Sequence, residues 1–238
     1  MLKEAIEKIL SLKQNATYNI NGDTYSDNEL VRIPKFVDRP KPISLSSLDS
    51  LVAMLKVEVD SGLNCPVFVN VSGAKTVSVY TTYAFDYSRN NIYTVTADTP
   101  DFDFGWREYD KAMIAFRSQF VQDDEVAYVL SLLSRITDEA SVSSGDNGLS
   151  QNVTVKSGIS LVAKETIRPH VTLRLYRTFL EVEQPKSEFL LRLEAGGRIG
   201  LFEADGGMWR LHARRTIAEY LRVELAECID NGNVIVTT

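Results

Sequence analysis

Arginine, carboxylate and aromatic side chains are densest between Arg168 and Leu225, so residue types that could bind or react are concentrated there. Arg174 and Arg177 alternate with apolar residues along a strand-like run, and Glu181 follows them on the same run. Such a strand face could hold cross-strand ion pairs, or its arginines could contact phosphates or a neighbouring subunit. Cross-strand pairs are the simpler interpretation, and Arg174, Arg177 and Glu181 remain binding or interface candidates.

A second group of candidates lies at the turn before the C-terminal helix. Glu203, Asp205 and His212 could form an oxygen-rich metal site if the turn folded over the helix. The simpler interpretation, which we adopt, makes Asp205 a cap at the helix N-terminus and leaves Glu203 facing solvent. We therefore expect no metal and no cofactor. Trp209 and Arg210 complete the set of binding or interface candidates.

The sequence offers little support for an enzyme. Residues 196–200 (GGRIG) faintly resemble a dinucleotide-binding loop, but a strand follows them where a phosphate site needs a helix N-terminus. The chain has two histidines and contains no P-loop, no nucleophile elbow and no zinc-protease motif. We predict no catalytic residues.

Composition narrows the class of protein. The formal net charge of -6 gives no sign of nucleic-acid binding, although a local basic face could be hidden in that total. The two cysteines, Cys65 and Cys228, have no metal-like spacing and suggest thiols in a reducing compartment. No apolar run reaches the roughly 18 residues of a membrane span. We expect a cytoplasmic protein with no membrane partner.

Hydrophobic periodicity predicts the secondary structure. We expect helices over 2–14, 46–59 and 106–120, another from about 123, and a last helix over 208–228. Period-two patterning from Pro66 to Asp98 predicts a three-stranded antiparallel meander. Strand-like runs follow over 153–167 and from 168 past the Gly196-Gly197 turn, and a short strand ends the chain.

These elements occur in blocks and do not alternate as βαβ units. The fold class is therefore α+β, with mainly antiparallel sheets, a meander plus a C-terminal sheet, packed with about five helices. We divide the chain into a helix and extended arm (1–45) and one body (46–238), with possible lobes at 46–139 and 140–238. Residues 140–152 are the stretch that could be a mobile loop or a ligand-clasping one.

Four stretches carry a resemblance to a known family. They are GWREYDKAMIAFRSQFV, SGDNGLSQNVTVKSGISL, LRLYRTFLEVEQPKSEFLLRL and LFEADGGMWRLHARRTIAEYL. Together they resemble the YfdQ-like phage and prophage family, whose function is unknown, over roughly residues 66–225. The resemblance implies a phage-encoded protein in the cytoplasm of a bacterial host. It brings no catalytic residues.

The expected function follows from the N-terminal arm. A short amphipathic helix cannot be stable alone and needs a partner, and well-patterned strands offer edges for pairing. We expect a non-enzymatic phage protein that assembles with itself into a homo-oligomer, with a ring or closed shell possible. The alternative is an early-gene binding protein that acts on single-stranded DNA, on a host defence factor or on the small-molecule signal of that factor.

Overall fold

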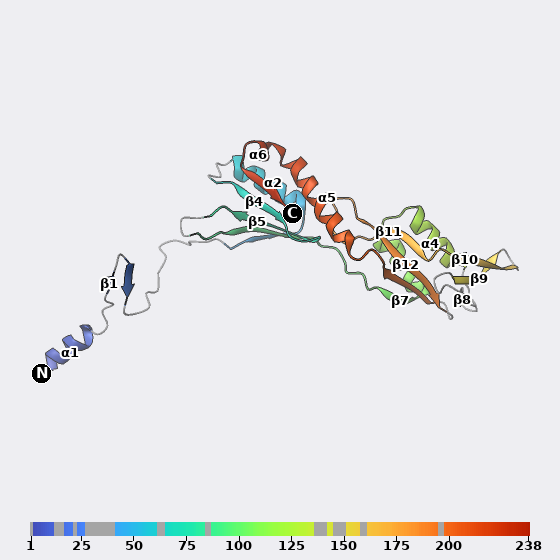
Figure 1. Ribbon diagram of the computed structural model, residues 1–238, viewed down its shortest axis with the longest axis horizontal. Helices are drawn as coiled ribbons and strands as arrows, with labels where there is room; N and C mark the ends of the chain where they lie inside the picture. The colour runs from blue at the N-terminus through green and yellow to red at the C-terminus, as the bar shows by residue number, and fades with distance from the viewer. Residues whose placement is uncertain are drawn as a thin grey trace. The chain divides into compact units, whose positions relative to one another are not determined.

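The chain consists of two compact units, Met1–Pro40 and Lys41–Thr238, in the computed structural model (Figure 1). The structure describes residues 2–11, 17–20, 23–26, 41–60, 65–83, 87–135, 142–144, 151–157, 161–194 and 198–238. The N-terminal arm, predicted to end at residue 45, is shorter than expected, because residues 43–45 form a strand of the second unit.

The described residues of the first unit form one helix and one hairpin. Helix α1 spans Leu2–Ser11, as predicted, and the rest of the predicted helix, residues 12–14, lies outside the described residues. Strands β1 (Thr17–Ile20) and β2 (Asp23–Ser26) pair antiparallel, where the sequence analysis expected an extended connector. The dipeptide between these strands, Asn21-Gly22, is one that favours two-residue hairpin turns.

A five-stranded mixed sheet organises the first part of the second unit. Its order is β14-β4-β5-β6-β3. The strands are β3 (Ile43–Leu45), β4 (Val67–Val71), β5 (Thr76–Thr81), β6 (Asn91–Thr96) and β14 (Val234–Thr237). The antiparallel meander β4-β5-β6 confirms the prediction. The two outer strands pair parallel to their neighbours, which the sequence analysis did not predict.

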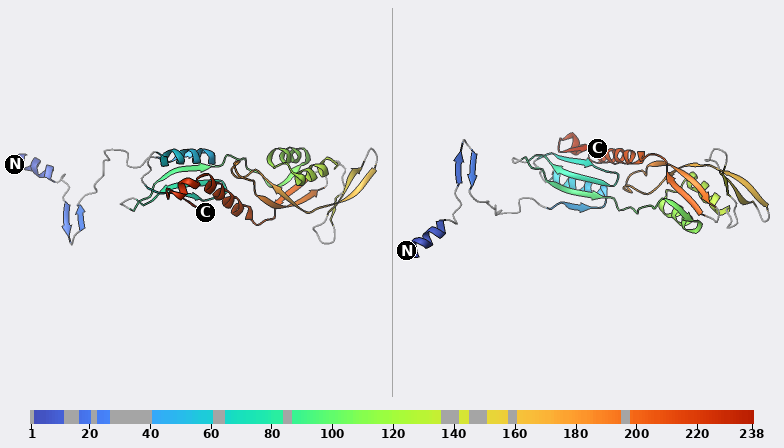
Figure 2. Two further views of the ribbon diagram at one scale, coloured as in Figure 1. Left: turned by 90° about the horizontal axis from the view of Figure 1, so that it is seen from above. Right: turned by 60° about the horizontal axis from the view of Figure 1, so that its bottom comes forward.

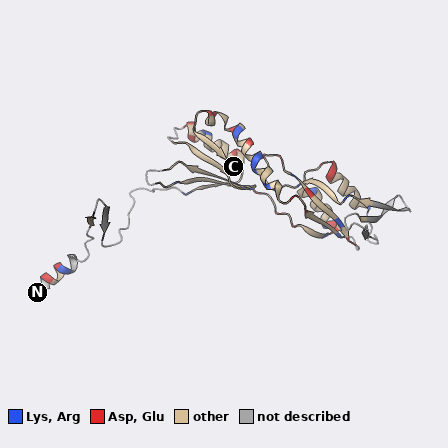
Figure 3. Ribbon diagram, in the orientation of Figure 1, with Lys and Arg blue, Asp and Glu red and all other residues tan. Residues whose placement is uncertain are grey.

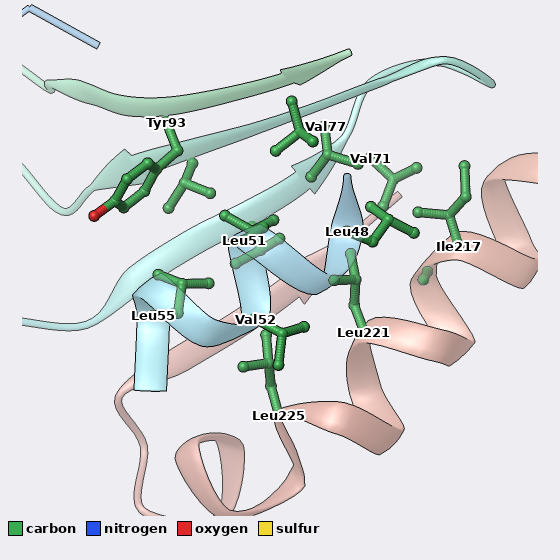
Figure 4. Packing of buried hydrophobic residues seen from close by; sticks show 14 of the residues in the cluster. Leu48, Leu51, Val52, Leu55, Val71, Val77, Tyr93, Ile217, Leu221 and Leu225 are labelled. Atoms are coloured by element: carbon green, nitrogen blue, oxygen red, sulfur yellow. The ribbon is translucent and has the colours of Figure 1, made fainter. Parts of the chain in front are cut away.

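Helices cover one face of this sheet. They are α2 (Leu48–Asp60), α5 (Met208–Glu224) and α6 (Ala226–Asp230), and their apolar side chains meet those of the strands (Figure 4). The α2 stripe Leu48, Leu51, Val52 and Leu55 is buried as predicted. Ser47 caps α2, because its Oγ accepts a 3.1 Å bond from the Ser50 amide. The Tyr220 hydroxyl on α5 donates to Asp49, which tethers the two helices.

A four-stranded antiparallel sheet organises the second core. Its order is β11-β12-β13-β7. The strands are β7 (Gly105–Glu108), β11 (His170–Arg174), β12 (Lys186–Glu194) and β13 (Arg198–Glu203). Helices α3 (Tyr109–Gln119) and α4 (Asp124–Arg135) bury their apolar stripes against one face of this sheet. Asp123 precedes α4 and caps its N-terminus, where a carboxylate was predicted, because its Oδ1 accepts a bond from the Val126 amide.

The predicted helix over 106–120 was wrong at its start. Residues 105–108 form strand β7, which pairs with β13, and α3 begins at Tyr109. The reason is tertiary, since Trp106 packs edge-to-face on Phe202 at a centroid separation of 5.8 Å. Gly200 makes room for this pair, because a Cβ there would lie 2.7 Å from the Phe202 ring.

A smaller three-stranded sheet has the order β10-β9-β8. Its strands are β8 (Val142–Ser144), β9 (Gln151–Ser157) and β10 (Leu161–Ile167). The predicted strand-like stretch over 153–167 is therefore a pair of antiparallel strands. The predicted loop over 140–152 contains β8 and the start of β9, while residues 140–141 and 145–150 lie outside the described residues. Gln151 joins this sheet to β12 through two hydrogen bonds with the Leu193 backbone.

The class is α+β, as predicted, with mostly antiparallel pairing. Six helices lie among the described residues, where about five were expected, because the last predicted helix is interrupted at Leu225. The predicted Gly196-Gly197 turn lies outside the described residues, but the strands on either side of it pair antiparallel. Within the described ranges, no helix is long and apolar enough to cross a membrane.

Candidate functional site

The stretch between β11 and β12 was predicted as strand but is an irregular connection from Leu175 to Pro185. The Gln184 side chain organises it. Its Oε1 accepts bonds from the Arg177 and Thr178 amides at 3.0 and 3.2 Å, and its Nε2 donates to the carbonyls of Phe179 and Val182. Gln184 is buried, so these bonds replace the strand ladder that these backbone groups lack.

Arg177 is the most engaged of the candidate residues. It is 4% exposed, and its Nη1 lies 2.5 Å from Glu203 Oε1 at the end of β13. Its Nη2 donates to the Ser187 hydroxyl, and its Cζ lies 3.9 Å from the centre of the Trp209 ring. Burial lowers the pKa of Arg177 from its ordinary value, and the Glu203 carboxylate partly opposes that shift. Glu203 is exposed, as expected, and its carboxylate also pairs with Arg177.

Asp205 shapes the start of α5, as predicted. Its carboxylate accepts bonds from the Gly207 amide at 2.9 Å and the Trp209 amide at 3.3 Å. Gly207 has φ of +83°, a conformation that favours glycine, and a Cβ there would lie 2.7 Å from Arg210 Nη1. The Arg210 guanidinium also lies over the Trp209 ring at 5.0 Å. Arg177, Glu203, Asp205, Trp209 and Arg210 thus come together in one cluster, which we call the arginine joint.

Two candidates lie outside the arginine joint. Arg174 bonds to Asp123 at 3.2 Å and to Glu183 at 3.4 Å. Glu181 Oε1 accepts a 2.7 Å bond from the Leu48 amide at the start of α2, where a carboxylate also stabilises the helix dipole. The expected strand face with alternating arginines and glutamates was wrong, because residues 177–183 are not in a strand. Each of the two side chains instead fixes a separate element.

The arginine joint lies where the chain passes between the two cores. Phe179 and Val182 are buried in the core of the five-stranded sheet, whereas Leu173 and Phe189 on the flanking strands belong to the other core. The Thr178 hydroxyl donates to the Ala74 carbonyl in the turn between β4 and β5. The irregular connection that carries Arg177 therefore contacts both hydrophobic cores of the second unit.

The alternative metal site from Glu203, Asp205 and His212 does not assemble. Two of these residues are used in the arginine joint, and His212 lies beside an open cavity of about 370 Å³ together with Glu183, Lys186 and Thr216. No group of three or more His, Cys, Asp or Glu side chains suited to a metal ion occurs within the described ranges. The chemistry of the joint is that of a buried guanidinium that stacks on an indole ring and pairs with an exposed carboxylate.

Sequence reasoning missed Gln184 and Ser187, which complete the joint. Both are buried polar residues, at 5% and 3% exposed. The available signal was Pro185, since a proline interrupts a strand and the residue before it is restricted. The run from 175 to 185 should on that ground have been read as a loop with internal side-chain bonds.

Changing Gln184 to glutamate tests this interpretation. The substitution keeps the shape but points a second oxygen at the carbonyls of Phe179 and Val182. We expect the free energy of unfolding to fall by about 2–4 kcal/mol, since a buried donor is lost and a charge is buried. Urea unfolding measures this. A fall of less than about 0.5 kcal/mol, typical of a surface substitution, would contradict the role assigned to Gln184.

Comparisons with protein-family models, with curated proteins and with solved structures give no match to this chain.

Proposed function

We propose that this chain is a non-enzymatic, self-assembling protein of a phage or prophage, which acts in the cytoplasm of the bacterial host and uses its first unit to bind a neighbouring copy. The phage context rests on the resemblance of four stretches within residues 66–225 to the YfdQ-like family. The assembly role rests on the physical character of the first unit. The arginine joint takes a structural role in this proposal, because its side chains bind one another.

Helix α1 is too short to be stable by itself. It has ten residues, and isolated helices shorter than about 12–15 residues are marginal in water. Its apolar residues recur at helical spacing, and Ile6 in the middle of that stripe is 49% exposed. Burying such a side chain contributes about 1.5–3 kcal/mol. An apolar partner surface would supply that burial.

The hairpin has the same requirement. Strands β1 and β2 have four residues each, and a lone two-stranded hairpin is marginally stable at best. All four side chains of β1 are exposed, including Tyr18 at 53% and Ile20 at 56%. The exposed aromatic and aliphatic side chains of this hairpin are the single observation that carries the proposal. They suit an element that becomes ordered against a second chain.

The test is an Ile6→Asp substitution in the full-length protein, with Lys8→Gln as the matched control. Both changes lower the net charge by one, but Lys8 lies on the polar side of α1. We expect the particle mass from light scattering to fall for Ile6→Asp and to stay unchanged for Lys8→Gln. The wild-type peak should show the 260/280 absorbance ratio of pure protein.

Two results would contradict the proposal. One is a wild-type monomer, and the other is an oligomer whose mass does not respond to Ile6→Asp. A small species that carries nucleic acid would instead favour the DNA-binding alternative, and its release at moderate salt would follow from counterion effects.

A further inference from the structure

One face of the five-stranded sheet is covered by α2, α5 and α6, and no described helix covers the other (Figure 2). Side chains alternate between the faces along each strand, and the burial patterns of β4 and β5 identify the inward valines. The residues on the opposite face, which we call the outer face, are Ser44, Phe68, Asn70, Thr76, Ser78, Tyr80, Asn91, Thr94, Thr96, Ile235 and Thr237.

The outer face carries no charge on its strands. Within the described residues, β3, β4, β5, β6 and β14 contain no Lys, Arg, Asp or Glu, and Figure 3 colours these strands tan. Arg89, in the connection between β5 and β6, adds a cation at the rim, with its Cζ 4.9 Å from the Phe68 ring centre and 4.3 Å from that of Tyr83. Charged residues make up 24% of the chain. Their absence from these strands is therefore selective.

The four-stranded sheet provides an internal comparison. Its uncovered face displays the charged residues Glu108, Arg174, Lys186, Glu188, Arg192, Glu194 and Arg198. That face has the usual composition of a sheet in contact with water. The outer face of the five-stranded sheet shares with an interface centre the depletion of charged residues, and most of its side chains are Ser, Thr or Asn.

A row of small polar side chains crosses the middle of the outer face. The row contains Thr237, Asn70, Ser78, Thr94 and Ser44, one from each of the five strands in order. Thr237 Oγ1 lies 3.2 Å from Asn70 Oδ1, and Asn91 Nδ2 donates to Thr94 Oγ1 at 2.9 Å. Ser78, on the central strand, is 7% exposed. The row is uncharged, and the paired residues Phe68 and Tyr80 lie to one side of it.

We propose that the outer face packs against the same face of a second copy, about a two-fold axis that passes close to Ser78. The strand residues of the outer face carry no charge, so superposing this face on its own copy brings no like charges together at the axis, while Arg89 over Phe68 adds a cation at the rim. Five strands of up to six residues give a plane of about 24 by 20 Å, so two copies bury roughly 1,000 Å². That area is at the lower end for a specific interface and suits a contact reinforced by a second one.

This inference shares the premise of self-association with the proposed function but rests on different residues. Nucleic acid is the less favoured occupant. Exposed aromatic side chains could stack on bases, but a phosphate backbone needs a basic groove, and the described strands contain no lysine or arginine. A second copy requires no such charge.

The test introduces a charge at the proposed axis in the full-length protein. Ser78→Lys and Ser78→Glu each place like charges opposite one another, so we expect sedimentation to show dimer dissociation increased roughly tenfold or more for each variant alone. Mixing the two variants in equal amounts should restore association, because opposite charges then meet. Thr172→Lys, at an exposed outward position of β11, is the matched control and should associate as the wild type does.

Ser78 is nearly buried, so folding is checked by thermal unfolding, and Thr94→Lys with Thr94→Glu repeats the experiment at the neighbouring position of the row. Unchanged association of folded Ser78 or Thr94 variants would overturn the proposal. Weaker association of the single variants without recovery in the mixture would also overturn it. So would binding of a labelled thymidine oligonucleotide to the wild type, if the glutamate variants abolish that binding and leave the particle mass unchanged.

The outcomes separate this inference from the function of the first unit. If Ile6→Asp leaves the particle mass unchanged while the Ser78 variants dissociate, the outer face is supported as an interface and the proposed role of the first unit is contradicted. If Ile6→Asp lowers the mass while the Ser78 variants do not, the reverse holds.

Discussion

Replacing Trp209 with alanine is expected to lower the free energy of unfolding by about 3–5 kcal/mol. The indole is 8% exposed and lies against the Arg177 guanidinium at 3.9 Å and the Arg210 guanidinium at 5.0 Å. The substitution therefore removes a large buried ring and two cation–π contacts, and it leaves a cavity at the start of α5. Urea unfolding followed by circular dichroism measures the change.

The other tryptophan is the matched control. Trp106 is 41% exposed on β7, so Trp106→Ala should cost clearly less than the Trp209 change. Trp209→Phe keeps part of the ring and should give an intermediate loss. Equal losses for Trp209→Ala and Trp106→Ala would mean that the arginine joint does not support the fold.

Replacing Arg177 with methionine is the second large effect we expect, a loss in the free energy of unfolding of about 2–4 kcal/mol. The substitution keeps much of the aliphatic length but leaves Glu203 and Ser187 without their partner. The main costs are the buried Ser187 hydroxyl left without its donor and the lost contact of the guanidinium with the Trp209 ring, whereas the exposed Glu203 carboxylate can be hydrated. Because Arg177 is 4% exposed, salt should screen this pair weakly, and the loss should be similar at low and high ionic strength.

A double-mutant cycle separates the pair from the packing. Arg177→Met combined with Glu203→Gln should recover part of the loss, since the orphaned charge is removed. Arg174→Met is the control, because Arg174 pairs with Asp123 and Glu183 at a partly exposed position and should cost about 1 kcal/mol or less. Additive effects of the Arg177 and Glu203 substitutions would show that the two side chains do not interact.

Local patterns in the sequence predicted most of the regular elements. The predictions of the meander strands and of helices α2 and α4 are confirmed, because the apolar positions of each pattern are the positions that the fold buries. Strand β7 was predicted as helix, because its pairing with β13 and the contact between Trp106 and Phe202 join residues far apart in the chain. No window of local sequence contains that information.

The candidate site shows the same division. Composition singled out Arg177, Glu203, Asp205, Trp209 and Arg210, and these residues meet in the arginine joint. Their partners could not be assigned, because the 2.5 Å pair between Arg177 and Glu203 joins residues 26 positions apart. Arg174 and Glu181 were grouped with them by nearness in sequence, but the irregular connection after β11 directs each to a different element.

The sequence by itself determined most of the helices and strands, and which residues carry unusual chemistry, since both depend on side-chain type and spacing. Tertiary structure decided the rest. It added β3 and β14 in parallel to the meander, and it buried Arg177 between Glu203 and the Trp209 ring. It also gathered the uncharged strands into one outer face. Each of these features depends on contacts between residues far apart in the sequence, which form only when the chain folds.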